Sequence, residues 1–278
     1  MADVIISVIL FSAMAILHIL RTQEDKEILS AEEEYEIGMA SNLGSNDVQQ
    51  DYFGVKKNNG AILMVLADGA GQYGEVAAKL TVDTFKELFE DETASLQPQY
   101  FFKRAANAAN KKIINTLEER QGESSVAAVI IKNSQLFYTL VGNSKIAVFR
   151  NGDLIPVSEG QTVDVLARHA YTEGKISRQE TLALLNEHRR YNVLGQDAFQ
   201  DIEIFDKPLT LEENDTVVIM SEGIFNVLRW VDMEQILSQR NSIQTLANNF
   251  IQTVKSSPQI YKDNATVLIC KKKNEVGT

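Results

Sequence analysis

Apolar positions along the chain fall into two patterns, short runs that predict β-strands and longer stretches with a three- or four-residue spacing that predict helices. The strand candidates are rich in Val, Ile, Phe and Tyr, and most of them end at Gly, Asn or Asp. They cover residues 51–56, 61–67, 125–131, 136–141, 146–150, 216–220 and 265–271. Helices are predicted over 75–90, 99–119 and 233–255.

Turn residues group these strands. Asn143 and the sequence Asn151-Gly152-Asp153 separate apolar runs between residues 135 and 154, which predicts an antiparallel meander. Residues 161–186 have mixed helical character and are expected to form a flap. Strands grouped in meanders, with helices between the groups, favour a single α+β domain in which packed sheets are covered by helices.

The N-terminal segment has a different pattern. Residues 4–20 carry no charge, which predicts a membrane-spanning anchor helix over 1–21, and Arg21 and Lys26 follow it. The expected arrangement is a single-pass membrane protein with a linker at 22–36, a cytoplasmic domain at 37–273 and a tail at 274–278. A helix buried in the core, or an uncleaved start peptide packed on the domain, is the alternative.

Composition excludes several functions. The chain has 38 Asp and Glu residues against 27 Lys and Arg residues, a formal charge of -11, which disfavours nucleic acid as a partner. Cys270 is the single cysteine, so no disulfide forms within the chain, and the three histidines are scattered without a zinc pattern. Any metal ion must therefore be bound by oxygen ligands.

Acidic residues stand at the ends of four predicted strands. Asp51 opens one strand, Asp68 closes another, Glu222 follows a third and Asp263 precedes the last. An acid at the end of a buried strand is costly unless it is paired or binds a cation, and several together suit magnesium or manganese. Each acid alone is as well explained as a turn former or a helix N-cap.

Seven motifs in order resemble those of the metal-dependent Ser/Thr protein phosphatases of the PPM family, the class called 2C. They are GMASNLGSNDVQQDYFGV, ADGAGQYGEVAA, GESSVAAVII, VGNSKIAVFRNGDLIPVSEGQTV, ISRQETLALLN, NDTVVIMSEGIFNVL and DNATVLI. The resemblance implies an α-β-β-α sandwich of two antiparallel sheets flanked by helices, and the compact spacing implies a bacterial source. It also implies one or two Mn²⁺ or Mg²⁺ ions and a phosphoprotein substrate.

The same resemblance assigns roles to individual residues. Asp68 would bridge two ions and Gly69 would offer its carbonyl. Glu222 and Asp263 would complete one ion, and Asp51 would orient bound water.

Several positions depart from the family pattern. Asn46 stands where the family has a phosphate-binding arginine, and Gln50 stands for the first residue of an acid pair. Asn143 and Asn226 stand for acids that resemble ligands of a third, catalytically important ion, and Glu222 is one methylene longer than the expected aspartate. An amide in place of a carboxylate keeps the shape and removes the charge, which lowers affinity for a cation.

Three functions are compatible with this pattern. The first is a pseudophosphatase that acts in phospho-signalling by binding a phosphoprotein or another protein. The second is an active Mg- or Mn-dependent phosphatase that uses Asp51 and Asp68 together with Glu222 and Asp263. The third is a structural domain whose acids only cap turns.

Overall fold

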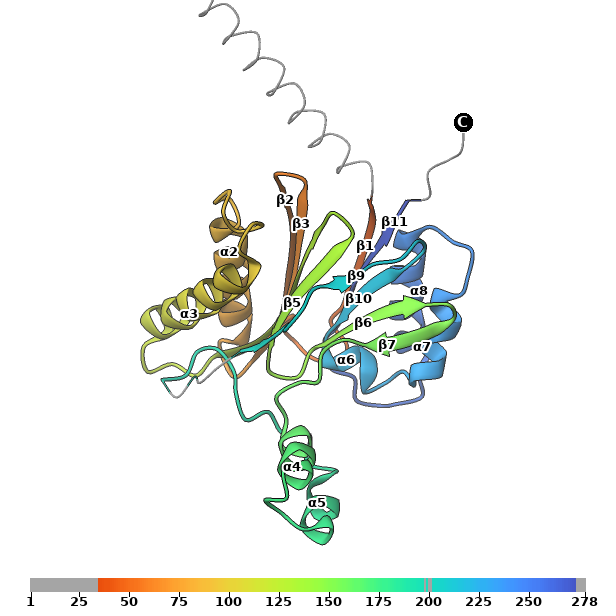
Figure 1. Cartoon of the computed structure of the whole chain (residues 1–278). Coiled ribbons are helices and arrows are strands. Elements are labelled where there is room, and N and C mark those ends of the chain that lie inside the picture. Colours follow the sequence, from red (N-terminus) through yellow and green to blue (C-terminus); the bar gives the residue numbers. More distant parts are fainter. Residues whose placement is uncertain (1–34, 198, 200–201, 274–278) are drawn as a thin grey trace, which may run out of the picture.

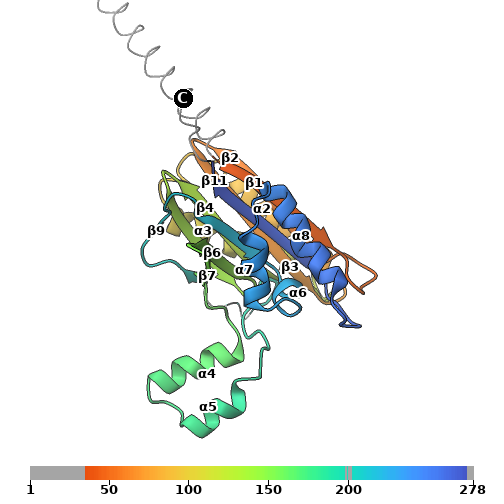
Figure 2. The ribbon, with the colours of Figure 1, turned by 90° about the vertical axis from the view of Figure 1, so that its right-hand side faces the viewer.

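The computed structural model describes residues 35–197, 199 and 202–273. Two antiparallel sheets pack face to face, and helices cover the outer side of each sheet (Figure 1, Figure 2). This is the arrangement of sheets and helices that the sequence predicts.

The first sheet has six strands in the order β2-β3-β4-β5-β8, with β9 also paired to β5. Its central strands are buried along almost their whole length, because one face meets helices and the other meets the second sheet. The strands are β2 (Asp51–Asn58), β3 (Ala61–Ala70), β4 (Glu123–Lys132), β5 (Gln135–Val141), β8 (Glu203–Ile204) and β9 (Leu209–Thr210).

The second sheet has five strands in the order β1-β11-β10-β6-β7. The turn Asn151-Gly152 joins β6 to β7, and both of its residues have positive φ, as a tight two-residue hairpin requires. The strands are β1 (Tyr35–Asn42), β11 (Ala265–Lys272), β10 (Thr216–Met220), β6 (Lys145–Arg150) and β7 (Asp153–Pro156).

Three hydrophobic clusters hold these layers together. One joins the six-stranded sheet to α2 (Gly74–Leu88) and α3 (Pro98–Leu117), and another joins the five-stranded sheet to α7 (Trp230–Leu237) and α8 (Ile243–Ser256). The third lies between the two sheets and contains Leu66, Leu140 and Leu268 among its members. At roughly 25 cal/mol per Å² of apolar surface, these buried layers provide the main driving force for folding.

Two further helices stand apart from the sheets. The flap, residues 162–190, contains α4 (Val163–Thr172) and α5 (Arg178–Leu184), which project away from the sandwich (Figure 1, Figure 2). Its two ends meet at a single antiparallel bridge between Thr162 and Arg190. A capping box at Ser177 and Glu180 begins α5.

Two predicted elements differ from the structure. The strands on either side of Asn143 were expected to pair, but β5 belongs to the six-stranded sheet and β6 to the five-stranded one. The chain crosses between sheets at Gly142, whose φ of +91° turns it there. The predicted helix over 233–255 is two helices, because the Ser242 side chain accepts a hydrogen bond from the Thr245 amide and starts α8 separately.

The prediction of a membrane anchor has to be corrected. No helix among the described residues is long and apolar enough to cross a membrane, and the predicted span at 4–20 lies outside those residues. The fold class is therefore corrected to the two-sheet sandwich with flanking helices, and the single-pass membrane localisation is not supported.

Candidate functional site

Asp51 and Asp68 lie opposite each other on neighbouring strands of the six-stranded sheet. They are direct partners in the β2–β3 register, and Ser125 on β4 is the next partner of Asp68. Directly opposed residues of an antiparallel pair project from the same face of the sheet, so the two carboxylates are neighbours. A pair of like charges in this position is unfavourable without a cation.

The surroundings of this pair raise both pKa values. Burial raises the pKa of Asp51 from 3.8 to about 6, although hydrogen bonds from Thr266 and Ser221 oppose the rise. The Ser221 hydroxyl donates to Asp51 Oδ2 over 2.7 Å. Burial also raises the pKa of Asp68 well above its usual value, and the charges of Asp51, Asp263 and Glu222 add to the rise. The four predicted acids are thus close enough to interact, although they come from two different sheets.

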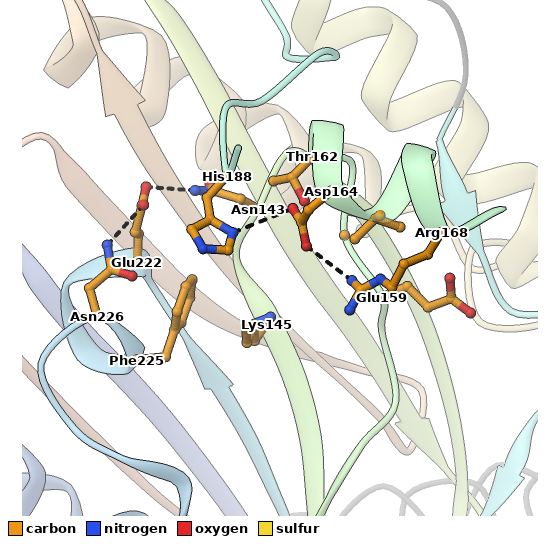
Figure 3. A pocket seen from close by; sticks show the side chains of 12 residues that line it. Asn143, Lys145, Glu159, Thr162, Asp164, Arg168, His188, Glu222, Phe225 and Asn226 are labelled. Carbon is orange, nitrogen blue, oxygen red and sulfur yellow. Dashed lines mark hydrogen bonds and ion pairs between the residues drawn. The ribbon is translucent and has the colours of Figure 1, made fainter. Parts of the chain in front are cut away.

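Glu222 is placed by the five-stranded sheet. It is the first residue of the short helix α6 (Glu222–Phe225), directly after β10. The Asn143 side-chain amide donates to one of its carboxylate oxygens over 2.6 Å, and the Asn226 amide donates to the other over 2.9 Å (Figure 3). Because a carboxylate only accepts hydrogen bonds, it fixes both amides with their N–H groups toward it.

Asp263 has the same type of partner. Its Oδ1 accepts hydrogen bonds from the Asn46 side-chain amide and from the backbone N–H of Asn264, both over 2.7 Å. The loop that carries Asn46 is held close to Asp263, since a Cβ on Gly44 would lie 2.3 Å from the Asp263 carbonyl oxygen.

Gly69 lies near the end of β3, opposite Ser124 on β4 and just before the turn at Gly71. A Cβ there would lie 2.1 Å from the Gly74 carbonyl oxygen, so only glycine fits. The Gly69 amide donates to the Gln50 carbonyl over 3.1 Å, and the Gln50 side chain donates to the Gly71 carbonyl over 2.7 Å. Gln50 therefore supports this turn through its backbone and its side chain.

The four substituted positions share one property. Each of Asn46, Gln50, Asn143 and Asn226 donates a side-chain N–H to an oxygen of this site, namely a carboxylate of Asp263 or Glu222 or the carbonyl of Gly71. The sequence indicates loss of charge at these positions. The structure adds that the new amides are donors to the carboxylates that remain.

Sequence reasoning missed Arg190. This residue sits at the base of the flap, and its Nη1 lies 4.0 Å from Asp68 Oδ1 and 3.0 Å from the Ser125 hydroxyl. Its Nη2 lies 3.5 Å from Glu123 Oε1, and its side chain is only 19% exposed. The positive charge of Arg190 opposes the rise in the pKa of Asp68. The doublet Arg189-Arg190 gave no signal, because only the fold brings the end of the flap to β3 and β4.

A pocket of about 300 Å³ opens beside Glu222, between α6 and the start of the flap (Figure 3). Its acids Asp164 and Glu222 already have partners, since Arg168 lies 3.1 Å from Asp164. Lys145 lies over the Phe225 ring at 4.9 Å, and burial lowers its pKa. The other lining residues include Glu159, Thr162 and His188.

These residues do not fit the set of metal ligands that the sequence resemblance implies. In the described part of the chain, no group of three or more His, Cys, Asp or Glu side chains is placed to hold a metal ion. Both oxygens of Glu222 already accept amide protons, and a metal ion there would have to displace them. Burial raises the pKa values of Asp51 and Asp68, so a positive charge close to this pair would stabilise its charged form.

Comparisons with known proteins agree with the fold. A family model described as protein phosphatase 2C matches residues 40–255. The serine/threonine phosphatase stp of Listeria welshimeri is 26% identical over 221 residues, which cover 74% of this chain and 83% of that protein. The solved serine/threonine phosphatase of S. agalactiae superposes with a TM-score of 0.73 at 21% identity, covering 86% of this chain and 100% of that one. The catalytic domain of the protein phosphatase PstP, solved with two manganese ions, gives 0.65 at 18% identity, with 87% and 99% covered.

Proposed function

The chain belongs to the protein phosphatase 2C family, the PPM-type Ser/Thr phosphatases, and from this premise we propose that it is a pseudophosphatase. Its role would be to bind a protein partner in phospho-signalling, a phosphoprotein or another protein, while hydrolysis of phosphoserine or phosphothreonine is weak or lost.

The observation that carries this proposal is the pairing of Glu222 with Asn143 and Asn226. An ion that activates water needs carboxylates that are free to bind it, and its charge must be offset by theirs. Here two acids of the family pattern are amides, and both amides hold the remaining carboxylate. Hydrogen bonds to a charged group contribute roughly 1.5–3 kcal/mol each, which an incoming ion must offset.

The phosphate side of the site supports the same proposal. Asn46 replaces the arginine that the family uses for phosphate, and its amide is engaged with Asp263. A neutral amide offers neither the charge nor the two parallel donors of a guanidinium. Affinity for a partner would therefore come from the protein surface around the site more than from a bound phosphate.

A second candidate is an active Mn- or Mg-dependent phosphatase, which one observation favours. Asp51 and Asp68 form an opposed pair whose pKa values are raised by burial and, at Asp68, by the neighbouring carboxylates, and a divalent cation would stabilise the charged forms. The relatives named as phosphatases, and the manganese ions in PstP, add weight to this candidate.

Hydrolysis of a phosphothreonine peptide by the full chain with Mn²⁺ separates the two candidates. An Asp68→Asn variant prepared in parallel gives the background, because it removes the central carboxylate. We expect the wild-type rate to equal that of the variant. Turnover by the wild type that the Asp68→Asn substitution abolishes would establish the active enzyme instead.

A further inference from the structure

Arg190 connects the flap to the carboxylates of the six-stranded sheet. Its backbone forms the bridge to Thr162 that closes the flap, and its side chain turns back toward Asp68. On either side of this bridge, the Val163 amide donates to the Arg189 carbonyl over 3.0 Å and the Tyr191 amide donates to the Gln161 carbonyl over 3.1 Å. The backbone on both sides of Arg190 is therefore fixed by hydrogen bonds.

The contacts of Arg190 lead directly into the amide network. Its Nη1 donates to the Ser125 hydroxyl, and that hydroxyl donates to Asn143 Oδ1 over 3.3 Å. Asn143 in turn donates to Glu222. A continuous set of hydrogen bonds thus runs from the base of the flap to the other side of the site, with Arg190 supplying its positive charge.

We propose that the Arg190 guanidinium is the resident counter-ion of Asp68 and competes with a divalent cation for that place. The proposal deepens the proposed function, on which it rests, because it gives Asp68 a cation that belongs to the chain itself. A guanidinium about 4 Å from a carboxylate in a partly buried site attracts it more strongly than it would in water, because the surroundings screen the charges less. A dication placed nearby would be repelled by the same charge.

The geometry suits competition better than a tight ion pair. Arg190 lies 4.0 Å from Asp68 and 3.5 Å from Glu123, whereas the Arg150–Asp215 pair elsewhere in the chain closes to 2.5 Å. A guanidinium at the longer distances neutralises two acids without a bidentate contact to either. An ion that binds Asp68 would therefore have to displace a loosely held group.

Calorimetric titration of Mn²⁺ into the full-length wild type, Arg190→Gln and Arg189→Gln tests this proposal. Arg189 is the matched control, since it is exposed, adjacent and of the same charge. We expect Arg190→Gln to bind Mn²⁺ at least about tenfold more tightly than the wild type, a difference of about 1.4 kcal/mol. Arg189→Gln should bind Mn²⁺ as the wild type does. Equal affinities in Arg190→Gln and the wild type, or the same gain in Arg189→Gln, would overturn the proposal.

Hydrogen exchange provides a second test that needs no variant. If Mn²⁺ displaces Arg190, saturating Mn²⁺ should accelerate exchange of the Val163 and Tyr191 amides at the flap base in the wild type. Unchanged exchange at these amides under saturating Mn²⁺ would overturn the competition. Peptide turnover by the wild type would count against the pseudophosphatase alone, because the affinity difference between Arg190→Gln and the wild type does not depend on hydrolysis.

Discussion

The two sheets contribute unlike halves to the same site. The six-stranded sheet provides Asp51 and Asp68, an opposed pair with raised pKa values that faces the charge of Arg190. The five-stranded sheet provides Glu222 and Asp263, whose oxygens accept hydrogen bonds from neutral amides. The carboxylates of the six-stranded half would be stabilised by more positive charge, whereas those of the five-stranded half are hydrogen-bonded to neutral donors.

This difference shows that the carboxylates of the two halves are stabilised in different ways, by neutral amides on one side and next to a guanidinium on the other. Replacing an acid by an amide removes one negative charge and adds a donor, so the neighbouring carboxylate gains a partner where it had a repelling neighbour. On the five-stranded side, Asn143 and Asn226 donate to the two carboxylate oxygens of Glu222. On the six-stranded side, Asp51 and Asp68 are opposed and the Arg190 guanidinium lies 4.0 Å from Asp68.

The largest expected effect comes from reversing the amides. The double variant Asn143→Asp/Asn226→Asp should lose about 3–5 kcal/mol of unfolding free energy without metal, because Glu222 loses two donors and gains two like charges. Mn²⁺ should restore most of that loss. Urea unfolding with and without Mn²⁺ measures both effects, and Asn107→Asp/Asn241→Asp, at two exposed positions, is the control. A double variant as stable as this control would show that the amides do not hold Glu222.

Neutralising one acid in each half should change stability in opposite directions. Asp68→Asn should raise the metal-free unfolding free energy at neutral pH, since burial and the neighbouring acids disfavour the charged carboxylate that the substitution removes. Glu222→Gln should lower it by about 1–2 kcal/mol, because one of its donors would then face an N–H group. Urea denaturation of both variants at one pH is sufficient. Changes of the same sign would break the distinction between the halves.

The pH dependence of stability should report on Asp51 in the six-stranded half. Because the pKa of Asp51 is raised from 3.8 to about 6, its contribution to stability is fully present below 3.8 and is lost as the pH rises through 6. Relative to the wild type, Asp51→Asn should therefore become more stable across this window, by about 1–2 kcal/mol. Denaturation of both proteins at the two ends of the window checks this, and parallel stability curves would contradict it.

The smallest effect is expected at Gln50. Gln50→Ala removes the side-chain hydrogen bond to the Gly71 carbonyl but leaves the backbone contact to Gly69. The expected cost is about 0.5–1 kcal/mol. Thermal unfolding measures this cost. The control is Gln99→Ala, which also loses one side-chain hydrogen bond to a backbone carbonyl, so the stability losses of the two variants can be compared directly. A cost several times that of the control would give Gln50 a larger role than support of one turn.

Much of the fold follows from local patterns in the sequence, whereas its sheet assignment does not. Short apolar runs and turn residues located β3, β4, β10 and β11 correctly, because these strands are buried on both faces and their side chains are mostly apolar. The break at Gly142 was taken for a turn within one sheet, since a crossover between sheets has no local signature of its own. The single helix expected over 233–255 was wrong because the cap at Ser242 interrupts a stretch that stays amphipathic on both sides.

The site was partly predictable for a similar reason. Acids at strand ends can be read along the chain, and the structure brings Asp51, Asp68, Glu222 and Asp263 within electrostatic reach of one another. The partners of those acids depend on tertiary contacts. Asn143 and Glu222 are 79 residues apart, and Arg190 reaches Ser125 across 65 residues, so neither contact is visible in spacing.

Anomalous diffraction from crystals soaked in Mn²⁺ tests the central claim most directly, because it locates the ion relative to Glu222. We predict no manganese peak within bonding distance of the Glu222 carboxylate, with the hydrogen bonds from Asn143 and Asn226 intact. A manganese ion bound to Glu222, with the two amides turned away, would contradict the claim that the five-stranded half is closed to metal.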